Sequence, residues 1–424
     1  MDSSRWQVPK GWEVKKLKDV FYINELSLPS NTPIDYQFRY IPIEQVSTNH
    51  ISFDECELFR FGDAPGRARR ILRENDVLIS GVRPNLKAFA IFKKPNTNDN
   101  WICSTGFFVL TAKKEEDNLV SYYELLSEIG GSQFYSYVAG SNYPAIGDSD
   151  IRNLRLILPP SEKDKRAVAN ILSKVDEAIA SVQNSIAAAE RLKKSLMQNL
   201  LTGKMKPDGT FRTPEEFYFD EKFGKVPVGW EVKRIKDFGE VQTGKTPPTD
   251  EPEVFSDEDN GFMFITPGDL DVAKYIEHTE RYVSEKGMRY SYVLPKDTVC
   301  EVCIGSTIGK IGITTTGCCS NQQITSVIVN NEHNAEYLYY AMLSRREHFK
   351  SVAGTNATPQ INKSGYSKYR VICPKDKQEQ IVIAKRISSV DKSINEQEQR
   401  IKCLERLKKS LMQNLLTGKI VITN

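Results

Sequence analysis

The sequence lacks the features that mark membrane-spanning and secreted proteins. In its 424 residues no apolar run approaches the roughly 18 residues that a membrane helix needs. The first residues, Met1 to Trp6, contain no apolar signal core. The eight cysteines follow no regular spacing, which in a chain of this length favours a reducing compartment over a disulfide framework. We therefore expect a soluble, cytoplasmic protein.

The chain as a whole also lacks a large excess of one charge, although one segment has a local excess. The net charge of +3 is too small to indicate a polyanionic partner. Between Arg60 and Lys94, however, nine basic residues are offset by only three acidic ones. Such a local excess is typical of phosphate binding, because each paired cation releases condensed counterions. A solvated basic face is the alternative interpretation.

Patterns of catalytic residues are absent. The four histidines, His50, His278, His333 and His348, form no ligand cluster by spacing. Neither a G-x-S-x-G elbow nor an H-E-x-x-H motif occurs. Nothing resembles a methyltransferase cofactor loop or an N-P-P-[FY] tetrapeptide. These absences favour a binding role without catalysis.

One segment fits the P-loop pattern G-x-x-x-x-G-K-[ST] letter for letter, at residues 239–246 (GEVQTGKT). A nucleotide site requires that a helix begin at this Gly-Lys-Thr, so that backbone N–H groups surround the phosphates. Pro247 and Pro248 follow at once and disfavour such a helix. We therefore expect a loop that contacts DNA through Lys245 and Thr246, and no nucleotide.

Two cysteine pairs raise the question of zinc. Cys300 and Cys303, together with Cys318 and Cys319, have the types and part of the spacing of a structural site. Cys300 and Cys303 lie in a β-rich segment, however, where residues three apart face opposite sides. The first half of the chain has no counterpart pair. Buried cysteines without a metal are therefore expected.

An internal repeat organises the chain. The sequence ERLKKSLMQNLLTGK occurs at residues 190–204 and again, identical at all fifteen positions, at 405–419. Near the start, VPKGWEV at residues 8–14 matches VPVGWEV at 226–232. The chain is thus two copies of one unit, although residues 15–142 and 233–356 share little with each other. A constant frame that carries two dissimilar inserts suits a bivalent reader of two targets, whereas duplication under uniform drift is the alternative.

The frame is predicted to be helical and the inserts to be β-rich. From residue 161 to 201, and again in the second copy, apolar residues recur at steps of three or four. Ser161 is a plausible N-cap, and Gly203 and Gly418 supply the helix ends. Two helices of about 40 residues, roughly 60 Å each, most economically pack on each other as a coiled coil; two unrelated helices in separate cores are the alternative. Short strands are expected at residues 76–80, 88–92, 106–110, 299–304, 308–314 and 325–329, and short helices at 120–129 and 335–346.

These features define five segments and an α+β fold. Residues 1–158 and 226–373 are predicted to form two globular α/β domains, and residues 159–204 and 374–424 two long helices. Residues 205–225, rich in proline, glycine and charge, are predicted to be the linker.

The combination resembles the specificity subunits of type I restriction–modification systems. The carriers are the two VPxGWEV starts, the two helix ends, the hairpin-like segment 304–313 and the segment GTNATPQI at 354–361. The first copy departs from this pattern, with SGVRPNLK at 80–87 and GSNYP at 140–144. The resemblance covers the whole chain.

The resemblance implies two target-recognition domains, each of which reads one half of a bipartite DNA sequence. The two domains are related by a pseudo-twofold axis, and two antiparallel long helices set the distance between them. Four fewer residues in each helix would shorten this distance by roughly 6 Å. Two modification subunits that use S-adenosylmethionine, and restriction–translocation subunits that use ATP and Mg, are the implied partners. No cofactor and no catalysis are expected in this chain. A non-catalytic adaptor that binds only proteins is the alternative function.

The candidate DNA contacts fall into two chemical classes. Phosphate positioning suits basic side chains, and base reading suits forked donors and amides. The candidates are Arg67, Arg69, Arg70, Arg83, Asn85, Lys87, Lys245, Thr246, Lys310, Gln322, Gln323, Thr355 and Asn356. We expect Trp12 and Trp230 to anchor the junction between each domain and its helix.

Overall fold

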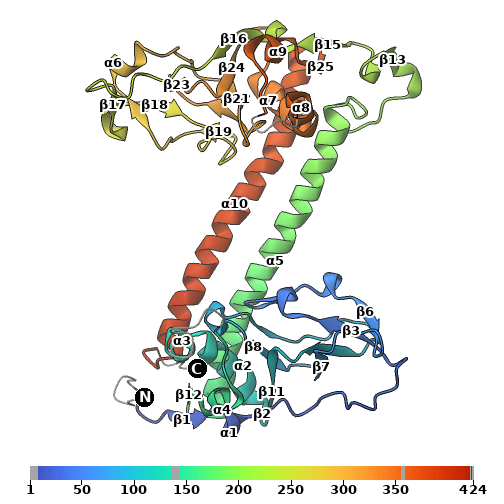
Figure 1. The fold of residues 1–424 in the computed structure, drawn as a ribbon, viewed down its shortest axis with the longest axis vertical. Coiled ribbons are helices and arrows are strands. Elements are labelled where there is room, and N and C mark those ends of the chain that lie inside the picture. The colour runs from blue at the N-terminus through green and yellow to red at the C-terminus, as the bar shows by residue number, and fades with distance from the viewer. Residues whose placement is uncertain (1–7, 136–143, 355–358, 421, 423–424) are drawn as a thin grey trace. The chain divides into compact units, whose positions relative to one another are not determined.

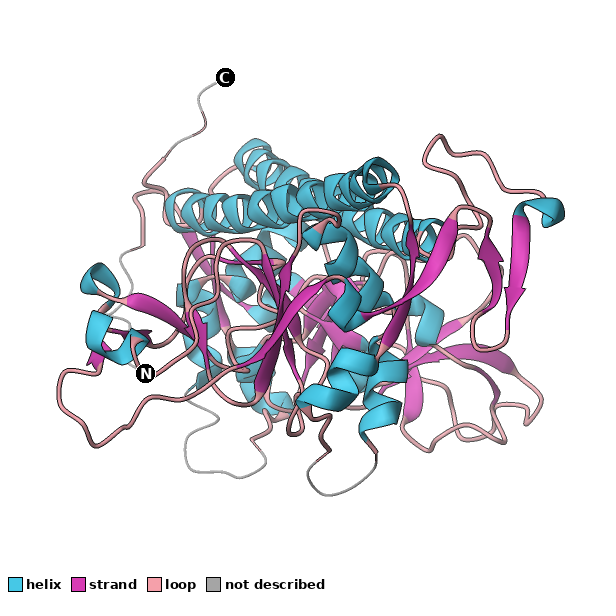
Figure 2. Cartoon of the chain, turned by 90° about the horizontal axis from the view of Figure 1, so that it is seen from above, coloured by secondary structure: helices cyan, strands magenta, loops and turns pink. Residues whose placement is uncertain are grey.

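The structure is a computed structural model, and it describes residues 8–135, 144–354, 359–420 and 422. The chain divides into two compact units. Unit 1 consists of Met1–Asn184 and Glu398–Asn424, and unit 2 of Ser185–Gln397. Each unit contains strands and helices, coloured separately in Figure 2. The predicted α+β class is confirmed.

Two helices of 39 residues each confirm the predicted helical frame: α5 (Glu162–Leu200) and α10 (Lys377–Leu415). The hydroxyl of Ser161 accepts a hydrogen bond from the N–H of Asp164 at 3.0 Å, which satisfies one free donor at the start of α5. After the helices, Gly203 and Gly418 have φ values of 68° and 63°, the left-handed conformation that ends a helix at low cost for glycine.

Within each unit the two helices run antiparallel. In unit 1, α5 contributes Val168 and α10 contributes Leu415 to one core. Further along α5, Asp176 pairs at 2.6 Å with Lys408, which precedes Leu415 in α10. Later residues of α5 thus contact earlier residues of α10, so the two helices run in opposite directions (Figure 1). In unit 2 the same relation holds, with Lys193 paired to Asp391 at 2.5 Å, and with Leu200 and Ile383 in a shared core.

The globular part of unit 1 is built on two four-stranded sheets, of strand order β2-β11-β8-β9 and β6-β3-β10-β7. A two-stranded sheet, β1-β12, joins it to α5, and β4 and β5 form a hairpin. The strands are β1 (Glu13–Lys16), β2 (Phe21–Ile23), β3 (Gln37–Ile41), β4 (Val46–Ser47), β5 (His50–Ile51), β6 (Leu58–Arg60), β7 (Ala68–Ile71), β8 (Val77–Ser80), β9 (Phe89–Ile91), β10 (Trp101–Ser104), β11 (Phe107–Ala112) and β12 (Arg155–Leu158). The short helices are α1 (Leu17–Val20), α2 (Glu115–Leu126), α3 (Glu128–Tyr135) and α4 (Asp148–Asn153).

Unit 2 has a five-stranded sheet, β16-β24-β21-β22-β19, a four-stranded sheet, β17-β20-β18-β23, and the joining pair β15-β25. Its strands are β13 (Phe217–Asp220), β14 (Gly224–Pro227), β15 (Trp230–Arg234), β16 (Gly239–Thr243), β17 (Phe255–Ser256), β18 (Phe262–Ile265), β19 (Tyr275–Ile276), β20 (Tyr282–Val283), β21 (Thr298–Val302), β22 (Ile311–Thr314), β23 (Cys319–Ser320), β24 (Ile324–Val329) and β25 (Arg370–Pro374). Its short helices are α6 (Glu285–Met288), α7 (Ala335–Ser344), α8 (Arg346–Ala353) and α9 (Lys363–Lys368). The segment predicted to be a linker contains β13 and the start of β14, an unexpected hairpin.

The two units share strand register although their sequences differ. In unit 1, β8 pairs antiparallel with β11, with Ile79 opposite Phe108. In unit 2, β21 pairs antiparallel with β24, with Glu301 opposite Thr325. The central parallel pairs also correspond, β3 with β10 and β18 with β23. Positions of one unit can therefore be matched to positions of the other by hydrogen bonds, without reference to side chains.

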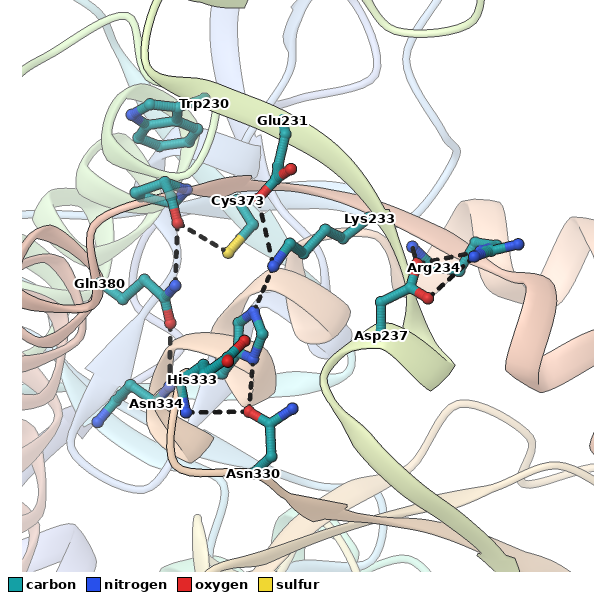
Figure 3. A network of polar contacts seen from close by, with 12 residues as sticks. Trp230, Glu231, Lys233, Arg234, Asp237, Asn330, His333, Asn334, Cys373 and Gln380 are labelled. Carbon is teal, nitrogen blue, oxygen red and sulfur yellow. Dashed lines mark hydrogen bonds and ion pairs between the residues drawn. The ribbon is translucent and has the colours of Figure 1, made fainter.

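A polar network fixes the start of α10 to its globular part (Figure 3). The amide of Gln380 donates to the carbonyl of Pro374 at 2.9 Å and accepts from the N–H of Asn334 at 2.9 Å. The indole N–H of Trp230, which is 2% exposed, donates to Glu379 at 3.1 Å. Trp230 therefore anchors the junction in unit 2, as predicted. In unit 1 a Cβ at Gly418 would lie 3.3 Å from Trp12, which places this tryptophan against the end of α10.

Candidate nucleic-acid interface

Four candidate residues of unit 2 lie together where β16 ends and β24 begins. The N–H of Gly244 donates to the carbonyl of Ile324 at 2.9 Å, which brings the 244–246 loop beside the 321–323 turn. The hydroxyl of Thr246 donates to the side-chain oxygen of Gln322. Lys245 and Gln322 are exposed. Lys245, Thr246, Gln322 and Gln323 thus form one polar surface, although 76 residues separate the bonded pair.

The 304–309 turn adjoins this surface. The amide of Gln323 donates to the carbonyl of Ile304 at 3.4 Å. The N–H of Gly305 donates to the carbonyl of Pro359 at 2.9 Å, so the segment from residue 359 also reaches the surface. Thr355 and Asn356 lie outside the described residues. Asn321 was missed in the sequence, although it precedes the two glutamines; its amide donates to Gln323 at 3.1 Å and fixes the orientation of that side chain.

The side chain of Lys310 bonds to a segment of unit 2 other than the 321–323 turn. Its ammonium group donates to the carbonyl of Pro267 at 3.3 Å, and its side chain is half-buried. It follows the turn at residues 305–309 but extends toward a different segment of unit 2. A role in phosphate contact stays a prediction for this residue.

In unit 1, Arg83, Asn85 and Lys87 share one loop that contains a short 3₁₀ helix (Pro84–Leu86). Arg83 and Lys87 flank this helix with φ values of 48° and 51°, a conformation that non-glycine residues rarely adopt. Arg83 is exposed, and its N–H donates to the carbonyl of Pro144 at 2.8 Å. Such backbone strain is most often retained where a side chain has to be aimed.

Lys87 is held by the protein itself. Its ammonium donates to the carbonyl oxygens of Leu126 at 2.7 Å and Ser127 at 3.1 Å, where α2 ends. Burial lowers the pKa of Lys87. The side chain therefore satisfies helix-terminal carbonyls, a favourable place for a cation. The side-chain oxygen of Asn85 is buried without a hydrogen-bond partner in the described part of the chain.

The three arginines around β7 differ in exposure. Arg67 is exposed, and its carbonyl accepts from the N–H of Thr105 at 2.8 Å, next to the residue that binds Gly81. Arg69 lies with its guanidinium carbon 4.5 Å from the centre of the Phe61 ring. Arg70 donates to the hydroxyl of Ser27 at 2.9 Å. Backbone bonds at Thr105 and Gly106 thus link Arg67 to the strand end that precedes the loop of Arg83, whereas the side chains of Arg69 and Arg70 are engaged within the unit.

The candidate surfaces of the two units are built on the same backbone frame. In unit 1 the N–H of Gly81 donates to the carbonyl of Gly106; in unit 2 that of Cys303 donates to the carbonyl of Gln323, both at 2.8 Å. The bond from Arg83 to Pro144 corresponds to that from Gly305 to Pro359. Arg83 therefore stands where unit 2 has Gly305, and Gln323 where unit 1 has Gly106. One frame displays two different sets of polar side chains.

The P-loop-like segment forms a strand followed by a loop, and the four cysteines of the two pairs are buried. Residues 239–243 are themselves strand β16, and residues 244–248 continue without a helix. Cys300 and Cys303 belong to two different core clusters, as expected for opposite faces of one strand. Among the described residues no group of three or more His, Cys, Asp or Glu side chains is arranged to hold a metal. No helix in the described ranges is long and apolar enough to cross a membrane.

Each unit also has a groove beside its copy of the repeat. Groove 1, in unit 1, has a volume of about 610 Å³, and groove 2, in unit 2, about 1020 Å³. The same nine repeat positions line both. In groove 2 they are Glu190, Lys193, Lys194, Met197, Gln198, Asn199, Leu201, Thr202 and Lys204, and in groove 1 their counterparts from Glu405 to Lys419. Both grooves thus present the same lysines beside the same apolar side chains.

Comparison with known proteins gives the family. A model described as the type I restriction modification DNA specificity domain matches residues 9–191 and again 227–406. The chain belongs to this family. The HindI specificity subunit of Haemophilus influenzae is 24% identical over 427 residues, with 87% of this chain and 91% of the relative covered.

Solved structures agree on the fold. The type I restriction–modification S subunit from M. genitalium matches with a TM-score of 0.61 at 14% identity, over 95% of this chain and 96% of that one. A chain from a study of complex assembly and conformational transition of the type I R-M system matches with a TM-score of 0.54 at 21% identity, over 98% and 100%. At these identities the likeness establishes the fold alone.

Proposed function

We propose that this chain is the DNA-reading subunit of a type I restriction–modification enzyme, in which each unit reads one half of a bipartite target. The observation that carries the proposal is the shared backbone frame with different side chains at equivalent positions, Arg83 against Gly305 and Gly106 against Gln323. Two equal frames with unequal donors are what a reader of two different half-sites requires. The family match to both halves of the chain supports the same conclusion.

The base-reading groups follow from hydrogen-bond chemistry. A guanidinium such as that of Arg83 matches the two acceptors of guanine, and a glutamine amide matches the acceptor and donor of adenine. The exposed cations Arg67 and Lys245 suit phosphate, and Lys310, Arg69 and Arg70 remain candidates for this role. Lys87 positions its loop through the end of α2 rather than by contact with DNA. This chain supplies recognition, and the chemistry belongs to partners.

The partners are two DNA-methyltransferase (modification) subunits, one at each groove. Nine identical side chains line the two grooves, and several of them are exposed polar residues that the packing of a core does not require. Two walls of identical sequence suit two copies of one protein. S-adenosylmethionine would bind to these subunits, and ATP and Mg to restriction–translocation subunits that complete the enzyme; no cofactor is assigned to this chain.

The test is to co-express the chain with its cognate modification subunit and to map methylated adenines across a genome. We expect one two-part motif with a spacer of fixed length. Replacing residues 15–142 with the corresponding segment of a relative is expected to change one half of that motif. Methylated sites without a shared two-part motif would refute the proposed function. A change in both halves of the motif after the segment exchange would refute the proposal that each unit reads one half.

A protein-only adaptor is separated from a DNA reader by a binding measurement. For a DNA reader assembled with its modification subunit, affinity for duplex DNA should fall as salt rises, because phosphate contacts release counterions. An adaptor should show no shift of duplex at low salt.

A further inference from the structure

Grooves 1 and 2 share the wall that the repeat supplies but differ in the wall that the globular part supplies. The equivalence is fixed by tyrosines: Tyr123 donates to Asp176 at 2.8 Å in unit 1, and Tyr340 donates to Asp391 in unit 2. Counting onward from these tyrosines, Glu124 corresponds to Ala341, and Glu128 to Arg345. All four residues line the grooves.

In groove 1 the wall from the globular part is acidic, and its Glu128 binds side chains of the repeat. The carboxylate of Glu128 lies 3.5 Å from the ammonium of Lys409 and accepts from the amide of Gln413 at 3.2 Å. A partner that needs either group has to displace Glu128 first. Glu124 adds a second carboxyl, which is 1% exposed; burial raises its pKa to about 8, so this group adds polarity but little charge at neutral pH, and Glu128 carries the negative charge of the wall.

In groove 2 the corresponding wall is positive and apolar. Arg345 stands in the place of Glu128, and its guanidinium lies 4.7 Å from the centre of the Phe223 ring. Ala341 replaces Glu124. The charge of this wall therefore adds to that of Lys194 and Lys204, which also line groove 2, whereas Lys193 is paired there with Asp391.

The segment after the first repeat copy enlarges groove 2. Residues of the hairpin and its approach, Phe211, Phe217 and Phe223, line a hollow that shares Thr202 and Arg345 with groove 2. Phe211 is 65% exposed. Exposed aromatic side chains beside an arginine are typical of the centre of a protein–protein interface.

We propose that grooves 1 and 2 are unequal docking sites for two copies of one subunit, and that groove 2 binds the first copy. The docking face of that subunit is acidic and partly apolar, because each repeat wall presents a methionine, a leucine and two lysines besides the one that an aspartate of its own unit pairs. On such a face Arg345 attracts where Glu128 repels, and Phe211 supplies apolar surface beside groove 2. The inference rests on the proposed function, which names the modification subunit as this partner.

The test is to titrate the purified full-length chain with its cognate modification subunit and to count species by native mass spectrometry. We expect a 1:1 complex to accumulate before the 2:1 complex. Glu128→Arg, which copies unit 2, should strengthen the second step by on the order of tenfold, and Arg345→Glu should weaken the first by a similar factor. Glu347→Arg and Lys350→Glu make the same charge changes at exposed positions of α8 that line neither groove, and should alter neither step.

Arg345 also packs against aromatic rings, so a second variant guards against a folding defect. Arg345→Gln removes the charge without reversing it, and should weaken the first step by a smaller factor. If both copies bind with equal affinity and neither Glu128→Arg nor Arg345→Glu changes the ratio, the inequality is refuted while docking stands. If no complex forms at any ratio, the proposed partner is refuted as well.

Discussion

Unit 1 and unit 2 attach the long helix to the globular part through different polar contacts. Where the long helix meets the globular part, unit 1 has an ion pair between Lys165 and Asp117, at 2.6 Å and with side chains only 7% and 5% exposed. At the equivalent place in unit 2 the side-chain oxygen of Gln380 accepts a hydrogen bond from the backbone N–H of Asn334. The joining β-sheets and the helix starts are otherwise alike. A duplicated frame therefore tolerates either a buried charge pair or a buried amide, provided that each polar group is satisfied.

The largest expected effect comes from breaking the charged version. Lys165→Met leaves Asp117 buried without its partner, so we expect the free energy of unfolding of unit 1 to fall by about 3–5 kcal/mol. The matched control is Gln380→Met in unit 2, which removes a neutral amide and should cost about 1–3 kcal/mol. Urea unfolding, with hydrogen exchange on α2 and α7 to assign the loss to a unit, measures both. Equal losses in the two units would contradict the distinction.

On the central strand of the sheet it is unit 2, and not unit 1, that buries an ionisable side chain. Glu301 on β21 stands where unit 1 has Ile79, and burial raises its pKa to about 8. From about pH 4.5 to 8 the unfolded chain releases this proton and the folded chain keeps it, so stability falls as pH rises across that window. Glu301→Gln should remove this slope and gain on the order of 3 kcal/mol over wild type between pH 5 and pH 8.5.

Denaturation midpoints of the two proteins across this pH range provide the measurement. Glu124 in unit 1, whose pKa burial also raises to about 8, is present in both proteins and cancels from their difference. A difference between wild type and Glu301→Gln that stays constant with pH would show that Glu301 ionises normally in the folded chain.

The sequence predicted the frame well and the side-chain contacts poorly, for a physical reason. Helix periodicity, the Ser161 cap and the terminal glycines are local signals, and α5 begins and ends within four residues of its predicted bounds. α10 begins within three residues of its predicted start but ends at Leu415, nine residues before the predicted end at 424. The expected strands were also found. Which strands pair depends on contacts distant in sequence, and so does the fate of Lys87, whose acceptors lie 39 and 40 residues away.

The same limit applies to the candidate site. That Lys245, Thr246, Gln322 and Gln323 share a surface follows from the pairing of β16 with β24, which no local pattern encodes. Polar composition identified the residues, and the sheet brought them together. For Arg69 the composition suggested a DNA contact, but the fold places its guanidinium over the ring of Phe61, a contact that a run of arginines does not reveal.

The two surfaces can be separated by single truncations. Arg83→Ala should relax discrimination at one position of one half-site by about 1–3 kcal/mol, and Gln323→Ala should do the same in the other half-site. Binding of the assembled enzyme to duplexes with single base changes reports both. If either substitution weakens binding to all sequences equally, that side chain contacts phosphate rather than a base.

The smallest expected effect is the most direct test of the comparison. Asp117→Asn together with Lys165→Gln gives unit 1 the residue types that unit 2 has at Asn334 and Gln380. The free energy of unfolding should change by no more than about 1 kcal/mol, because two neutral amides that can bond to each other or to the backbone replace a satisfied charged pair. Each single substitution should cost more than the pair, since it leaves one buried group without its match; a double-mutant cycle in urea measures this coupling. Additive losses would mean that the two residues act independently, and that the junctions of unit 1 and unit 2 are alike in backbone only.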